Sequence, residues 1–230
     1  MTSRSIRERE DDVKRIVSIA FVLIAILGIA QPALAARSTG TDYIEVFYPG
    51  WTDPHLTISV QTGANTPDQT VAAVYDAIAL WSQTLQRAFD GAVTLTLVTD
   101  SQADIQVNLT KSRAGGTVFG AFALCAPNRG CTILESSVLH PIPQPTPGKP
   151  GDYPYEWSLL TAAHEIGHTL GLGHAQPIET STDLMGYGAF AIGDPSFTIS
   201  KCDIEALAVV WEWALNGEEP RAPSVDTVDC

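Results

Sequence analysis

Apolar residues recur every three or four positions between residues 66 and 89, and this spacing predicts a long amphipathic helix. The apolar stripe consists of Val71, Val74, Ile78, Trp81, Leu85 and Phe89. Thr66 is the expected N-cap of this helix and Pro67 its first helical residue. One face of the helix is therefore expected to lie against the core.

Short runs rich in aromatic and β-branched residues predict strands on both sides of this helix. The expected strands are residues 43–48, 56–60, 93–98, 105–109, 115–122 and 132–135, and the last of these is expected at the edge of the sheet. A further helix is predicted to begin near Ser158. The last helix is predicted over residues 204–215, after Ser200 and Asp203 in a capping-box arrangement.

The second of these helices carries a run of residues suited to a catalytic zinc ion. His164 and His168 are four residues apart, so on a helix they lie on one face, one above the other. Gly171 and Gly173 are expected to end the helix, because glycine tolerates the left-handed conformation common at helix C-termini. The reversed chain can then bring His174 to the metal as a third ligand.

Three protein ligands distinguish a catalytic zinc from a structural one, because the fourth tetrahedral position stays open for water. Glu165 directly follows the first expected ligand, where its carboxylate can hold this water as general base. The run therefore predicts a zinc-dependent hydrolase.

This extended histidine motif resembles that of the metzincin superfamily of zinc endopeptidases, which places a methionine-containing turn after the third ligand. The chain has Met185 eleven residues beyond His174. The resemblance implies that Met185 lies beneath the metal as an apolar floor. Tyr187 follows, as in astacins and serralysins, where such a tyrosine approaches the zinc and stabilises the oxyanion; a packing role for Tyr187 remains the alternative.

The order of elements over residues 42–216 resembles the catalytic domain of matrixins, although matrixins usually have proline at the position of Tyr187. The resemblance implies an α+β fold. Its features are a small, twisted, mostly parallel sheet with an antiparallel edge strand, a zinc-binding helix and a C-terminal helix. It also implies an enzyme that cleaves polypeptides, which pair with the edge strand as an added strand. The alternatives are a non-catalytic zinc-binding adhesion module and a zinc hydrolase of non-peptide amides or esters.

The N-terminal 35 residues have the pattern of an export signal. Residues 1–35 contain a charged segment, an apolar run and a small-residue cleavage pattern, so they are interpreted as a signal peptide. Residues 36–230 are interpreted as one metalloprotease domain with a core at about 42–216 and a C-terminal tail at 217–230. The protein is expected to be secreted and monomeric, without a stable membrane partner after cleavage. An uncleaved N-terminal anchor is the alternative.

The net charge of the chain limits the kinds of molecule that it is expected to bind. The formal net charge of −13 disfavours binding to nucleic acid, because the phosphate backbone repels an acidic chain.

All four cysteines follow the expected signal peptide, and an oxidising compartment favours two disulfides. Cys125 and Cys131 flank a turn-rich loop and are expected to pair, which leaves Cys202 with Cys230; a free Cys230 is the alternative.

One catalytic zinc is the expected cofactor. Only His55 and His140 lie outside the zinc motif, and two histidines are too few for a second site of three histidines. Calcium binding by loop carboxylates such as Asp100, Asp104 or Asp194 is a further hypothesis, although no ordered calcium loop is evident.

Overall fold

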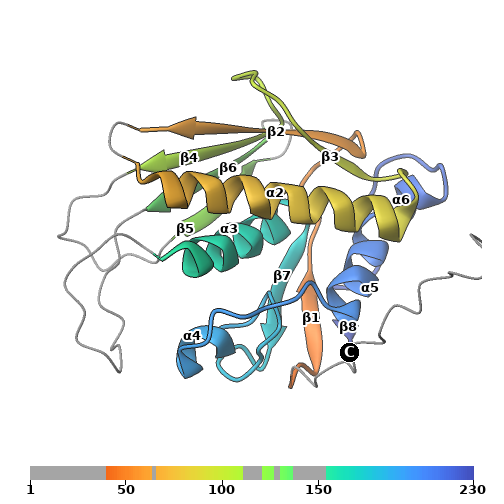
Figure 1. Ribbon diagram of the computed structural model, residues 1–230. Coiled ribbons are helices and arrows are strands. Elements are labelled where there is room, and N and C mark those ends of the chain that lie inside the picture. The colour runs from red at the N-terminus through yellow and green to blue at the C-terminus, as the bar shows by residue number, and fades with distance from the viewer. Residues whose placement is uncertain (1–39, 64–65, 111–120, 127–129, 137–153) are drawn as a thin grey trace, which may run out of the picture. The chain divides into compact units, whose positions relative to one another are not determined.

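The larger of two sheets has five strands in the order β3-β2-β4-β6-β5 (Figure 1). The computed structural model describes residues 40–63, 66–110, 121–126, 130–136 and 154–230. The five strands are β2 (His55–Thr62), β3 (Thr94–Leu97), β4 (Ile105–Thr110), β5 (Ala121–Ala126) and β6 (Gly130–Ser136). The pairs β2–β3, β2–β4 and β4–β6 are parallel, whereas β5 pairs with β6 in the antiparallel direction. The expected mostly parallel sheet with an antiparallel edge strand is confirmed.

The prediction that residues 132–135 form the edge strand was wrong. These residues belong to β6, which is hydrogen-bonded to β4 on one side and to β5 on the other. Strand β5 ends at Ala126 and β6 begins at Gly130, and Cys125 lies opposite Cys131 in the register and forms a disulfide with it. The antiparallel pairing places β5 outside β6, so β5 is the edge strand among the strands that the structure describes.

A second, three-stranded antiparallel sheet supports the zinc motif. Its order is β7-β1-β8, with β7 at Leu172–Gln176, β1 at Tyr43–Val46 and β8 at Thr227–Asp229. The residues expected to form a tail therefore contribute a strand. Strand β8 is further fastened by the predicted disulfide between Cys202 and Cys230.

Two long helices pack against each other and against the large sheet (Figure 1). They are α2 (Asp68–Phe89) and α3 (Tyr155–Thr169). Thr66 is not the N-cap of α2, because its hydroxyl donates to the carbonyl oxygen of Gly63. Pro67 is the N-cap instead, since it keeps an extended ψ of 138°. Helix α3 begins three residues before the predicted Ser158, after Pro154 as N-cap.

The remaining helices follow the zinc motif. They are α4 (Gly188–Ile192), α5 (Lys201–Val210) and α6 (Glu212–Leu215), so the single helix expected over 204–215 is interrupted at Trp211. The predicted capping box is present: the Ser200 side chain accepts from the backbone N–H of Asp203, and the Asp203 side chain accepts from that of Ser200. Helix α5 packs on β1 and β8.

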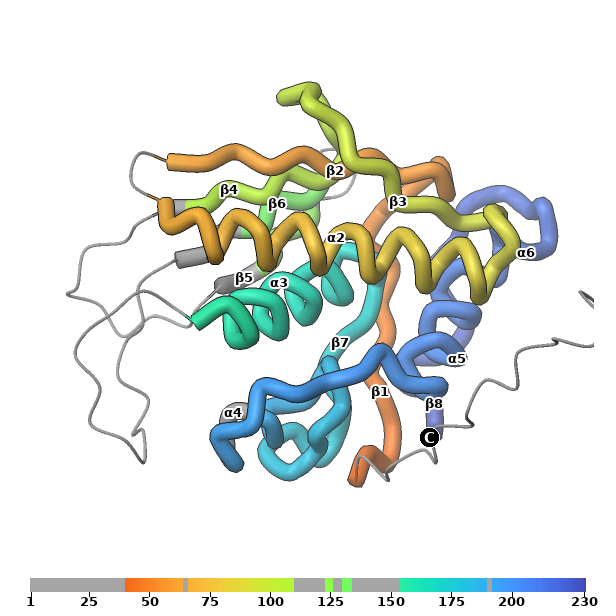
Figure 2. Tube along the Cα trace, viewed as in Figure 1, coloured from red at the N-terminus to blue at the C-terminus, as the bar shows by residue number. Residues whose placement is uncertain are grey.

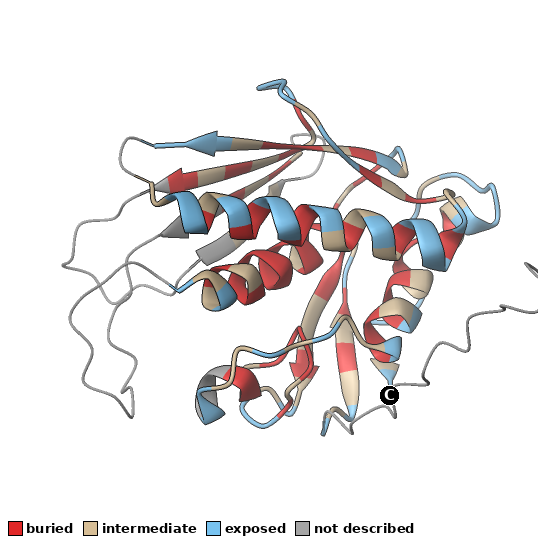
Figure 3. Ribbon diagram, viewed as in Figure 1, coloured by how far each residue is buried: buried red, intermediate tan, exposed pale blue. Residues whose placement is uncertain are grey.

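The two long helices are buried to different extents, which explains why the hydrophobic stripe of α2 could be predicted from the sequence. Buried positions alternate with exposed ones along α2, whereas α3 is buried along most of its length (Figure 3). Trp81 of α2 is fully buried, and its indole nitrogen donates to the carbonyl oxygen of Ala163 in α3. The active-site helix is therefore an interior element whose position is fixed on several sides.

Some predictions fall outside the described residues. These are the signal peptide with its cleavage site, residues 115–120 of an expected strand, and His140. In the part of the chain that the structure describes, no helix has both the length and the apolar character needed to cross a membrane.

Candidate active site

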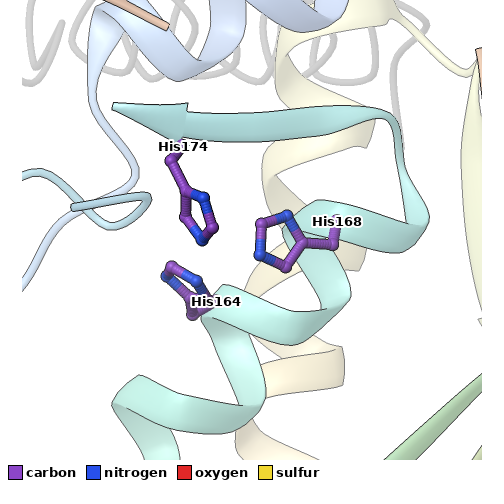
Figure 4. A group of neighbouring side chains, drawn as sticks. All are labelled: His164, His168 and His174. Carbon is purple, nitrogen blue, oxygen red and sulfur yellow. The ribbon is translucent and has the colours of Figure 1, made fainter. Parts of the chain in front are cut away.

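Three histidine side chains converge where α3 passes into β7 (Figure 4). His164 and His168 come from α3, and their ring centroids are 4.7 Å apart. His174 comes from β7, and its ring centroid lies 4.8 Å from that of His168. One nitrogen from each ring lies within 4.8 Å of the others. Among the described residues, this is the only group of three or more side chains that could hold a metal ion.

Backbone carbonyls set the orientation of two of these rings. Nδ1 of His164 lies 2.7 Å from the carbonyl oxygen of Leu184, and Nδ1 of His168 lies 2.7 Å from that of Leu172. Since a carbonyl only accepts, each Nδ1 carries the proton, which leaves Nε2 with a free lone pair. Burial lowers the pKa of His164 to about 3 and that of His168 to about 4. The rings are therefore neutral, as metal binding requires.

The two glycines after the helix have different roles, which corrects the prediction that both adopt a left-handed conformation. Gly171 has φ +106°, and a Cβ there would lie 2.6 Å from Cγ1 of Val210. Gly173 lies within β7 at an ordinary φ, and a Cβ there would lie 2.6 Å from Cβ of Glu45 in β1. Gly171 thus makes the turn, which can be followed in Figure 2, and Gly173 allows β7 to approach β1 closely.

Met185 lies directly under the zinc helix. It is fully buried, and its carbonyl oxygen accepts from the N–H of Ala175, the residue after His174. Gly167, inside the histidine motif, leaves the space for this side chain: a Cβ there would lie 2.6 Å from Sδ of Met185 and 3.4 Å from Cζ2 of Trp81. The methionine thus packs against the helix that carries two of the histidines.

Gly167→Ala is expected to weaken zinc binding, although alanine favours a helix by about 1 kcal/mol over glycine. Overpacking in a close-packed interior typically costs about 1–3 kcal/mol, because Met185 must move and Trp81 lies behind it. Zinc titration and thermal unfolding measure the effect. Adding Met185→Leu, which removes the clashing sulfur at similar volume, is expected to restore part of the loss. Unchanged zinc affinity in Gly167→Ala would contradict the close packing.

Three tryptophans donate hydrogen bonds to the zinc helix, one in its middle and two at its C-terminal end, and the sequence spacing did not indicate this role. The indole nitrogens of Trp51 and Trp81 donate to the carbonyl oxygens of Thr169 and Ala163, each at 2.8 Å. That of Trp211 donates to the carbonyl oxygen of Leu170 at 3.1 Å. Buried indoles usually find such partners, but the partner carbonyls lie 41 to 118 residues away in the sequence.

Glu165 follows His164 on α3, and its carboxyl group is buried close enough to Tyr187 for its charge to affect the pKa of that phenol. It is 7% exposed, and its Oε2 atom has no hydrogen-bond partner among the described residues. Burial raises the pKa of Glu165 to about 7, against the opposing effect of a backbone hydrogen bond from Ala123 in β5. A carboxyl group that exchanges a proton near neutral pH is suited to general acid–base chemistry.

Tyr187 closes another side of the histidine cluster. Its hydroxyl oxygen lies 3.2 Å from Nε2 of His174, and its ring centroid lies 5.9 Å from that of His164. Burial and the charge of Glu165 raise the pKa of Tyr187, so the phenol keeps its proton. The backbone is fixed by a 2.7 Å hydrogen bond from its N–H to the carbonyl oxygen of Ile178.

The edge strand β5 borders the site and lines a hollow of about 380 Å³. The lining residues are Phe47, Ala123, Leu124, Cys125 and His168. Leu124 is 60% exposed and Phe47 is 38% exposed, so both present apolar surface to solvent. An apolar hollow between a free sheet edge and the histidine cluster can receive a side chain of an extended ligand.

The other candidate ligands do not join the cluster. His55 is exposed, and its Nδ1 lies 3.1 Å from the Thr94 hydroxyl. Asp104 accepts from the backbone N–H and the hydroxyl of Thr57. Asp100 and Asp194 each accept from the backbone N–H two residues further on. Calcium binding at these carboxylates stays a prediction.

Comparisons with known proteins agree with this geometry. Residues 57–175, half of the chain, match the model of the reprolysin-like metallopeptidases of family M12B. The interstitial collagenases of Sus scrofa and Equus caballus are each 26% identical over 205 residues, covering 78% of this chain and 36% of the relative. The chain therefore matches little more than a third of the length of these relatives.

Proposed function

This chain belongs to the reprolysin-like metallopeptidases of family M12B, and we propose that it is a secreted zinc endopeptidase with Glu165 as its general base. The expected metzincin-like fold and metallopeptidase identity are confirmed. The observation that carries the proposal is the convergence of three neutral imidazoles beside a buried carboxyl group that lacks a partner for one oxygen. Secretion is supported by the two disulfides.

The residues present fit a catalytic zinc ion. His164, His168 and His174 would hold it through neutral nitrogen atoms, which are preferred zinc ligands. Zinc bound by three protein ligands supplies Lewis-acid polarisation of a carbonyl group and lowers the pKa of water. Met185 does not serve as a ligand in this arrangement; it supports the helix from below.

Glu165 moves the proton. One carboxylate oxygen accepts the proton of the attacking water, and the carboxyl group then donates it to the nitrogen of the leaving amine. The hydrogen bond from Ala123 holds the carboxyl group beside β5, which takes the substrate-pairing role that the sequence had suggested for residues 132–135. General base and substrate backbone are thus positioned by the same strand.

The free edge of β5 offers backbone groups to an extended polypeptide, which adds to the sheet as a further strand. Side chains of such a substrate alternate between the two faces, so one can enter the hollow between Phe47 and Leu124. This geometry favours unfolded or looped polypeptides, and it favours an apolar residue at the position that meets the hollow.

Tyr187→Phe is expected to lower kcat by about 10²-fold without loss of zinc, because the phenol donates to the charge developing on the substrate carbonyl oxygen. Steady-state kinetics with zinc content recorded measures this. Tyr75→Phe, at an exposed tyrosine of α2, is the control and should behave like the parent. Parental kinetics in Tyr187→Phe would instead support the packing role.

The function is tested by incubating the purified, zinc-loaded protein with a denatured protein substrate and identifying the products by mass spectrometry. Cleavage at internal peptide bonds, lost on removal of the metal and restored by zinc, supports an endopeptidase. A protein that binds zinc at its three histidines but cleaves nothing would favour the non-catalytic binding module. Hydrolysis of small amides or esters alone would favour the third alternative.

A further inference from the structure

Two buried carboxyl groups meet away from the zinc ligands, between the methionine turn and α5. Asp183 lies two residues before Met185 and is 1% exposed, while Asp203 lies in the first turn of α5 and is fully buried. Charged groups at such depth are costly unless they are compensated. No ion pair found within the described ranges reaches them; the nearest in sequence joins Lys201 to Glu205 at the surface.

Backbone N–H groups satisfy one oxygen of each carboxyl group. Oδ2 of Asp203 accepts from the N–H of Ser200 at 2.7 Å, and Oδ1 of Asp183 accepts from that of Leu184 at 2.7 Å. The other two oxygens, Oδ1 of Asp203 and Oδ2 of Asp183, are buried and have no hydrogen-bond partner among the described residues. The two carboxyl groups lie close enough to interact, and two carboxyl oxygens can be hydrogen-bonded to each other only if one of them carries a proton.

Burial, and then the negative charge of Asp183, raise the pKa of Asp203 well above its ordinary value. A proton on Oδ1 of Asp203 would be donated to Oδ2 of Asp183, the two oxygens that have no other partner. Every oxygen of the pair then has a partner, and the pair carries one negative charge instead of two.

We propose that Asp183 and Asp203 share one proton and act as positioning residues for the zinc ligand His164. Leu184 joins the pair to the ligand: its N–H donates to Asp183, and its carbonyl oxygen accepts from Nδ1 of His164. With the shared proton in place, a continuous path of hydrogen bonds runs from the N-cap of α5 to the metal site. The inference rests on the proposed zinc site, but not on the reaction that the site performs.

The path predicts an effect on zinc affinity. Partners of a metal-ligating histidine fix its tautomer and ring orientation, and their loss typically weakens metal binding by about 10–100-fold. Since the N–H of Ala175 also donates to Met185, a displaced methionine turn would disturb the strand that carries His174 as well.

The test is the zinc dissociation constant, measured by competition with a chelator, for Asp183→Asn, Asp203→Asn and the double variant. Either single change places one amide against one carboxylate, so an N–H replaces the shared proton and affinity should remain near that of the parent. The double variant brings two amide NH₂ groups together, and we expect about 10–100-fold weaker binding. Asp203→Ala offers Asp183 no hydrogen-bond donor, so its zinc affinity should be similarly reduced. Asp203→Asn restores a donor at the same position and should therefore restore the affinity.

Infrared difference spectra add a measurement that does not depend on zinc. The difference between the parent and each single Asn variant should contain the signal of one protonated carboxylic acid, while the unchanged Glu165 cancels from the difference. Absence of that signal from both difference spectra would overturn the shared proton. Parental zinc affinity in a folded double variant would overturn the link to His164. Loss of affinity in both single Asn variants would show that two ionised carboxylates are required. All these readouts apply even to a protein that cleaves no peptide, so failure of this inference and failure of the proposed function are distinguishable.

Discussion

Glu165→Gln is expected to lower peptide hydrolysis by about 10²- to 10⁴-fold while the protein keeps its zinc. Glutamine has nearly the same shape as glutamate, but its amide cannot accept and return a proton at neutral pH. The three histidines are unchanged, so zinc content should match that of the parent. The measurement is kcat/KM on a peptide substrate together with zinc stoichiometry.

Glu156→Gln provides a matched control for this variant. Glu156 lies in the first turn of the same helix, but it is exposed and distant in sequence from the histidines. The control should therefore retain parental activity, and any loss in it would measure the general effect of the substitution on α3. Near-parental hydrolysis by Glu165→Gln would contradict the general-base role and leave zinc polarisation as the main source of rate enhancement.

The histidine cluster could be predicted from sequence because most of its geometry is local. A helix fixes the relation between His164 and His168, and the glycine-containing turn brings His174 back within six residues. The capping box at Ser200 and Asp203 is local in the same sense. The pairing of Cys125 with Cys131 also follows from a short separation along the chain. In these cases the sequence spacing itself limits the distances between side chains.

The remaining features depend on contacts between distant segments, which spacing does not reveal. The status of β6 as an inner strand depends on the β5–β6 hairpin folding back along its outer side. Gly173 is required by the approach of Glu45, which lies more than a hundred residues earlier. Asp203 was recognised as a capping residue, but its second partner, Asp183, belongs to another element. Gly173 and Asp203 were therefore recognised for a role within their own segment, at a helix end, whereas their contacts with distant segments became evident only in the folded chain.

His168→Ala is expected to abolish tight zinc binding, since two imidazoles from separate elements cannot replace a preorganised three-nitrogen site. A ligand that binds only the folded state stabilises it by about 2.7 kcal/mol at a free concentration 100 times its dissociation constant. For a domain of this size, that corresponds to a rise in Tm of about 5–10 °C. The parent should show this rise on addition of zinc, and His168→Ala should not.

His55→Ala is the matched control, because this histidine is exposed and lies outside the cluster. It should bind one zinc ion per chain and show the same rise in Tm as the parent. Because His168 is neutral and its Nδ1 already donates to Leu172, its removal does not leave an unpaired charge in the interior. The metal-free His168→Ala protein should therefore remain folded, which separates loss of zinc from loss of structure. Retention of one tightly bound zinc ion in this variant would contradict the ligand role of His168.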